Sequence, residues 1–102
     1  MALVIYVENQ LHERGRAVID DGANTFLNLA RRLSQAGTQV LDIIDPYADA
    51  MLNFIQLDRL CRELDAALAT GLSDAERSLA TEVRAAAAEA REQSGYLFIE
   101  GD

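Results

Sequence analysis

The sequence predicts an α+β domain in which three main helices pack on a small sheet that includes the N- and C-terminal strands. Two observations carry this prediction. An apolar run suited to a strand lies at each end of the chain, at Ala2–Val7 and Tyr96–Ile99, and the segment between them repeats its apolar residues at helical spacing. With 102 residues the chain fits one domain, residues 1–102, which is long enough to bury its own core.

The first run, Ala2–Val7, is continuous and rich in β-branched residues, which is typical of a strand covered on both faces. A polar loop follows at Glu8–Gly15, and Arg16–Asp20 can return as a second strand to make a hairpin. His12 lies in the loop. It is the only histidine, so we interpret it as a solvated surface residue rather than a metal ligand.

The first helix is expected at Ala23–Gln35, capped by Asp20 or Asp21 and stopped by Gly37. Two interpretations remain open for Thr38–Ile44, a short strand or one helical turn. Its apolar residues come in two adjacent pairs, which favours the helical turn: Val40 with Leu41, and Ile43 with Ile44.

The central helix carries the clearest start signal in the chain. Asn53 and Gln56 have the spacing of a capping box, and the apolar repeat predicts a helix over Phe54–Ala69 that ends at Gly71. Its inner stripe includes the only cysteine, Cys61, which we interpret as a small buried apolar residue rather than a reactive thiol. On the outer face two pairs of opposite charge stand four residues apart: Asp58 with Arg62, and Arg59 with Glu63.

A second capping box, Ser73 with Glu76, predicts the last helix over Asp74–Glu92, and the short connection makes it an antiparallel hairpin with the central helix. Ser94-Gly95 then ends this helix, and Tyr96–Ile99 is expected to pair with the N-terminal strand. The inner stripe of this helix is rich in alanine: Leu79, Val83, Ala86 or Ala87, and Ala90.

Between the first and central helices lies a turn, Asp45-Pro46-Tyr47-Ala48-Asp49. Pro46 disfavours the helical region for Asp45, whose carboxylate can bond an amide two residues on. The acids here, together with Asp42 and Asn53, are alternatively an oxygen-rich metal site. Their spacing is not that of a calcium loop, so we favour structural capping and expect no metal.

The charge balance narrows the possible partners. Seventeen acids against nine bases, all of them arginine, give a net charge of −8, which disfavours binding to nucleic acid. The acidity alone does not separate simple solubility from docking on a basic partner. No apolar run is long enough to cross a membrane, and one cysteine excludes an internal disulfide, so we expect a cytoplasmic protein.

No nucleophile elbow, phosphate loop, zinc spacing or dinucleotide fingerprint is present in the sequence. One histidine and one cysteine leave little material for a catalytic dyad or triad. We therefore expect a protein that is not an enzyme and that needs no cofactor.

The pattern Asp45-Pro46-Tyr47-x-Asp49 followed by Asn53-x-x-Gln56, with Gly101-Asp102 after the last strand, resembles a group of small bacterial proteins of about this length. They are similar to the immunity-type proteins that accompany toxins. In that pattern a glycine often follows the tyrosine, where this chain has Ala48. The resemblance implies a protein-binding function and supplies no catalytic residues.

The functional expectation is a non-enzymatic protein-binding module, most concretely an immunity-like protein that blocks a basic toxin through an acidic surface. The expected partner-binding residues are Asp42, Asp45, Tyr47 and Asp49. The first alternative is a structural or regulatory subunit that forms a homodimer through the alanine-rich face of the last helix. The second is a small enzyme or metal protein built on the aspartate cluster.

Overall fold

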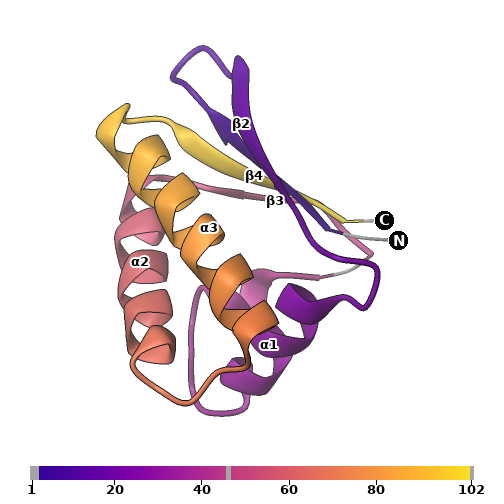
Figure 1. Cartoon of the computed structure of the whole chain (residues 1–102). Coiled ribbons are helices and arrows are strands. Elements are labelled where there is room, and N and C mark those ends of the chain that lie inside the picture. Colours follow the sequence, from indigo (N-terminus) through magenta and orange to yellow (C-terminus); the bar gives the residue numbers. More distant parts are fainter. Residues whose placement is uncertain (1–2, 46, 102) are drawn as a thin grey trace.

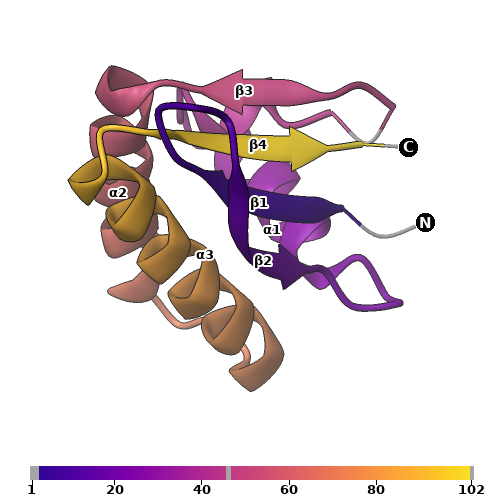
Figure 2. The same cartoon turned by 90° about the horizontal axis from the view of Figure 1, so that it is seen from above.

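The computed structural model describes residues 3–45 and 47–101, and in it four antiparallel strands form one sheet (Figure 2). The spatial order is β2-β1-β4-β3, with strands β1 (Val4–Glu8), β2 (Arg14–Ile19), β3 (Ala50–Leu52) and β4 (Tyr96–Glu100). The two strands from opposite ends of the chain lie side by side at the centre of the sheet, as the sequence predicts. The hairpin β1–β2 is also confirmed.

The helices form a second layer that covers one face of this sheet (Figure 1). They are α1 (Thr25–Ser34), α2 (Phe54–Leu68) and α3 (Asp74–Glu92), and a short 3₁₀ turn, η1 (Leu41–Ile43), connects α1 to the strand β3. The predicted α+β class with three helices is therefore confirmed. The helical interpretation of the 38–44 segment is also confirmed by η1.

Alternation along the central strands separates the two faces of the sheet. Ile5 and Ile99 are a cross-strand pair that is almost fully buried against the helices, whereas the neighbouring pair Tyr6 and Phe98 is only half-buried on the opposite face. The prediction that the first strand is covered on both faces is wrong. Its run stays apolar because the outer residues are covered by side chains from the same sheet, not by a further layer.

Both capping boxes are present as predicted. Asn53 accepts hydrogen bonds from the amides of Ile55 and Gln56, while Gln56 Oε1 accepts from the Asn53 amide; Ser73 and Glu76 repeat the arrangement at α3. At α1 both candidate caps accept hydrogen bonds from backbone amides at the start of the helix. Asp20 accepts from the amides of Phe26 and Leu27, and Asp21 accepts from those of Ala23 and Thr25.

The helix ends agree less well with expectation. Gly37 ends the first helical segment with φ of 100°, but among the described glycines it alone has a positive φ, so Gly71 is not the left-handed stop expected after α2. Instead the Arg77 guanidinium donates to the carbonyls of Leu68 and Thr70. Gly95 follows α3 where a Cβ would lie 2.0 Å from the Glu8 carbonyl oxygen, so no other residue fits there.

The alanine-rich stripe of α3 faces inward. Ala80, Ala86, Ala87 and Ala90 are all 0% exposed in the core, and the small side chains allow α3 to approach its neighbours closely. The face expected to form a homodimer is therefore already covered within the fold. Leu79 lies at the margin of the stripe and is only partly buried.

No helix among the described residues is long and apolar enough to cross a membrane. The predictions that fall on Ala2, Pro46 and Asp102 lie outside the described residues.

Candidate protein-docking surface

Exposed apolar side chains are concentrated in one segment of the chain. Seven large apolar side chains are exposed in the described part of the chain, and five of them belong to the segment from η1 to the start of α2. We call these five the β3 corner: Ile43 (42% exposed), Tyr47 (81%), Met51 (45%), Phe54 (58%) and Ile55 (67%). The other two, Leu11 and Ile19, belong to the β1–β2 hairpin and lie away from this segment in sequence.

Local structure fixes the side chains of the β3 corner in their exposed positions. β3 is the last strand of the sheet, and Met51 pairs with Phe98 on the face that the helices do not cover. Leu52 is fully buried on the other face, and the Asn53 cap then starts α2, so that Phe54 and Ile55 stand in its first turn. Leu57 is fully buried one turn further, so Leu52 and Leu57 anchor the corner on both sides of the cap.

The acidic turn next to the corner is ordered by its own hydrogen bonds. Asp45 Oδ1 accepts from the Tyr47 amide at 2.8 Å, which is the expected Asx turn. Asp49 Oδ1 accepts from the Gly101 amide at 2.9 Å, and Asp42 Oδ1 accepts from the Thr38 hydroxyl at 3.2 Å. All three carboxylates and Tyr47 are exposed. The exposed carboxylates of Asp42, Asp45 and Asp49 therefore lie on the same chain segment as Tyr47 and the other residues of the β3 corner.

Gly101 explains why two distant parts of the sequence pattern belong together. A Cβ at Gly101 would lie 2.5 Å from the Ala48 carbonyl oxygen and 2.8 Å from the Asp45 carbonyl oxygen, so the end of β4 lies tightly against the turn. Ala48 is not among the described residues with positive φ, and alanine is compatible with this position. The sequence alone does not reveal the contact between Gly101 and the turn.

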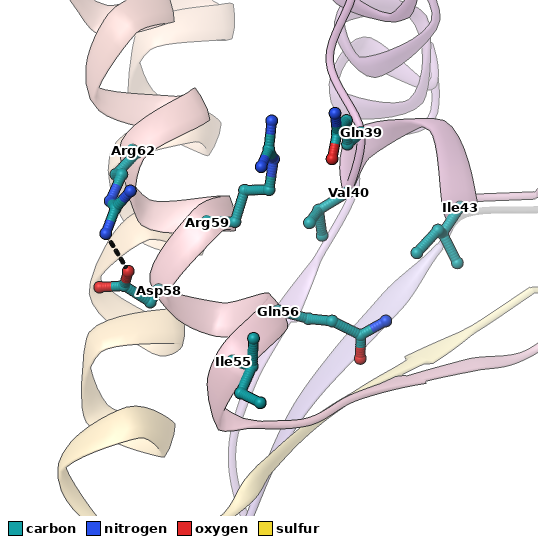
Figure 3. Close-up of a pocket in the computed structure, with 8 residues that line it drawn as sticks. All are labelled: Gln39, Val40, Ile43, Ile55, Gln56, Asp58, Arg59 and Arg62. Atoms are coloured by element: carbon teal, nitrogen blue, oxygen red, sulfur yellow. Dashed lines mark hydrogen bonds and ion pairs between the residues drawn. The ribbon is translucent and has the colours of Figure 1, made fainter.

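A groove runs beside the corner between α2 and the η1 segment (Figure 3). Its volume is about 470 Å³. Ile43 and Ile55 point toward it from opposite sides, and Val40 lies at its back (Figure 3). The remaining lining side chains are polar or charged, with both signs present: Gln39, Gln56, Asp58, Arg59 and Arg62.

Glu63 holds the far wall of this groove. Its carboxylate accepts hydrogen bonds from the backbone amides of Gln39, Val40 and Leu41 at distances of 2.7 to 3.2 Å. The sequence predicts only the pairing of Glu63 with Arg59, which is present at 3.5 Å. The contact of Glu63 with the η1 segment joins residues more than twenty positions apart, so no local spacing in the sequence predicts it.

The rest of the uncovered sheet face is arranged differently. We call the half-buried rings Tyr6, Tyr96 and Phe98 the central sheet face. The Arg14 guanidinium carbon lies 4.2 Å from the centroid of Tyr6 and 4.9 Å from that of Phe98, and the His12 ring stacks on Tyr96 at 4.7 Å.

One buried carboxylate holds both covering side chains in place. Glu8, whose side chain is 5% exposed, accepts from His12 Nδ1 at 3.1 Å and from Arg14 Nε at 3.3 Å. His12 is therefore half-exposed but engaged, which corrects its interpretation as a merely solvated residue.

Cys61 is 2% exposed on the inner stripe of α2, as predicted. Burial raises the pKa of its thiol, and the nearby Arg84 and Arg91 guanidinium groups offset this only in part. A buried thiol with a raised pKa is a poor nucleophile at neutral pH.

The oxygen ligands of the aspartate cluster do not converge. Within residues 3–45 and 47–101 no three acidic, histidine or cysteine side chains are grouped so as to hold a metal ion. No protein-family model, curated protein or solved structure matches the chain. The likeness to immunity-type proteins thus stays a prediction.

Proposed function

We propose that the protein is a non-enzymatic protein-binding module of the cytoplasm, which neutralises a cognate basic toxin by covering it with the β3 corner and the adjoining acidic turn. The observation that carries the proposal is the coincidence of two features on one short segment. Five exposed apolar side chains and the exposed carboxylates Asp42, Asp45 and Asp49 lie between η1 and the first turn of α2.

The composition of this surface is that of a protein interface. Interfaces have an apolar, often aromatic centre and a polar rim, and contiguous exposed apolar residues mark interaction sites. Tyr47, Met51 and Phe54 are of the residue types enriched at such centres. The open groove lined by Ile43 and Ile55 of the same corner offers a place for one side chain of the partner.

The charge of the surface favours a basic partner. Three exposed carboxylates lie on the same segment as the apolar side chains, and the whole chain carries a net charge of −8, so a basic protein is attracted at long range and guided to this segment. Inhibition by such binding needs no chemistry from the chain. It needs only that the partner's working surface be covered.

The proposal is tested by co-purification from the native host with matched variants. Ile55→Asp places a charge in the β3 corner, and Ile19→Asp makes the same change at an exposed isoleucine on the opposite edge of the sheet. We expect a basic protein that is retained by the wild type and by Ile19→Asp and is lost with Ile55→Asp. Expressed alone, that protein should stop growth, and co-expression of the wild type should restore it.

A partner retained equally by both variants places binding elsewhere, and a captured protein without toxicity removes the immunity-like role while leaving protein binding intact. The contribution of charge is then measured with the double variant Asp42→Asn and Asp49→Asn. Asparagine keeps the Oδ1 acceptor that Asp49 offers to Gly101, so the fold is retained. We expect slower association and a weaker dependence of the on-rate on salt.

A further inference from the structure

The outer edge of β3 has free backbone groups at one position. The Asp20 amide donates to the Leu3 carbonyl, which fixes the alternation of hydrogen bonds across the sheet: odd-numbered residues of β1 face β2 and even-numbered ones face β4. In the register of β1 with β4, the even-numbered residues of β4 therefore bond to β1 and its odd-numbered residues bond to β3. The partners of these odd-numbered residues in β3 are Ala50 and Leu52. The N–H and C=O of Met51 therefore point away from the sheet.

We propose that a second copy of this chain occupies the β3 corner of the free protein, by antiparallel pairing of β3 with β3 across a two-fold axis at Met51. The proposal rests on the β3 corner as the docking surface of the proposed function and adds a form of regulation to it. The Met51 N–H of each copy donates to the Met51 carbonyl of the other, which is the pairing that a two-fold axis allows.

The sequence around Met51 is complementary to itself in this arrangement. An antiparallel two-fold at Met51 sets Asp49 of one copy opposite Asn53 of the other, where the positive end of α2 begins. The 45% exposed side chain of Met51 lies at the axis and so within the contact.

The size of the effect follows from the shortness of the strand. Asn53 already uses its amide and carbonyl in the α2 cap, so pairing stops there and adds two backbone hydrogen bonds at Met51. Each copy also carries a net charge of −8, which opposes association. We therefore expect a weak dimer with a Kd of roughly 10 to 100 μM, which added salt strengthens by screening the repulsion.

The dimer hides the surface that the proposed partner needs, so the two compete. Their salt dependences have opposite signs, because association with a basic partner is weakened by salt. Without its partner the protein thus forms a dimer, and a partner of higher affinity dissociates this dimer.

The test uses the protein alone, by sedimentation equilibrium from about 5 μM to about 1 mM, a range that spans the expected Kd. Met51→Pro removes the outward N–H, and Met51→Ala removes the same side chain but keeps the N–H. Ile19→Pro is the control on the other edge, because the same alternation places the Ile19 N–H outward on β2. Thermal melts establish that each variant is folded.

We expect the wild type and Ile19→Pro to dimerise with similar constants that increase with salt. Met51→Pro should weaken the dimer about tenfold more than Met51→Ala does, which corresponds to losing hydrogen bonds worth about 1.4 kcal/mol. A wild type that is monomeric throughout the range overturns the proposal, and so does a dimer that Met51→Pro leaves unchanged. Neither result bears on the co-purification experiment, so the dimer and the partner-binding function fail independently.

Discussion

The central sheet face and Met51 of the β3 corner lie on the same side of one sheet, yet the chain covers the first with its own side chains and leaves the second exposed. Tyr6, Phe98 and Met51 form one cross-strand row from β1 through β4 to β3. At the Tyr6 end the rings are covered by Arg14, whereas Met51 at the other end remains 45% exposed. The difference separates surface that this chain covers for itself from surface that is left for another molecule.

The cause of the difference is the connection beside each region. The β1–β2 hairpin is long enough to turn His12 and Arg14 back over the rings, and the buried Glu8 carboxylate binds both. β3 has three residues and passes directly into the cap of α2, so no neighbouring segment returns over Met51. On this sheet, the face without a further layer is covered by Arg14 and His12, which the buried Glu8 carboxylate holds in place.

The largest expected effect comes from removing the cover of the central sheet face. Arg14→Ala exposes Tyr6 and Phe98 and takes one of two partners from a nearly buried carboxylate, so we expect a loss of about 2 kcal/mol in unfolding free energy. Denaturant melts measure it, and binding of an apolar dye should rise as this face comes to resemble the β3 corner. Arg16→Ala, two residues further along β2, should change the unfolding free energy by less than about 0.5 kcal/mol. Equal small losses for both variants would mean that Arg14 does not cover the face.

A smaller effect is expected at the support of the β3 corner. Asn53→Ala removes the cap of α2 and should cost about 1 kcal/mol, whereas Asn53→Ser should be milder because serine also caps. Since Phe54 and Ile55 stand in the first turn of α2, fraying there should also broaden their NMR signals. Denaturant melts in which both substitutions are neutral would show that the cap does not hold the corner in place.

The smallest effect concerns the helix layer beneath both regions. Hydrogen bonds from Arg84 lower the pKa of Asp65, and those from Arg32 lower the pKa of Glu76. A carboxylate with a lowered folded-state pKa contributes stability above its unfolded-state pKa and loses it as the pH falls through the folded-state pKa.

Acid melts at a series of pH values below about 5 should therefore show a falling unfolding free energy. The fall should be shallower in Asp65→Asn and in Glu76→Gln, with Glu82→Gln as the control for the loss of one acid. A slope that these substitutions leave unchanged would place the acid sensitivity outside the helix layer.

Local sequence signals were sufficient for the helices and for the central strands. The capping boxes at Asn53 and Ser73 place the starts of α2 and α3, because a cap depends on residues three apart. β3 was not predicted, since three residues between an acidic turn and a helix cap carry no period of two. Its strand conformation comes from pairing with β4, which is distant in the chain.

The candidate site was predicted in part for the same reason. The acids of the 42–49 segment and Tyr47 are visible as a cluster in the sequence. Met51, Phe54 and Ile55 flank the buried Leu52 in one apolar run, and nothing in that run separates exposed from buried residues. The covering role of Arg14 depends on the hairpin register and has no sequence signal.

The central claim, that the β3 corner is open to a ligand and the central sheet face is closed, is tested most directly by NMR. Dilute protein is titrated with isopropanol as a small apolar probe, and chemical-shift changes are followed for every assigned residue. We predict the largest changes at Ile43, Met51, Phe54 and Ile55, with small changes at Tyr6 and Phe98. Changes at Tyr6 and Phe98 as large as those at the β3 corner would contradict the claim.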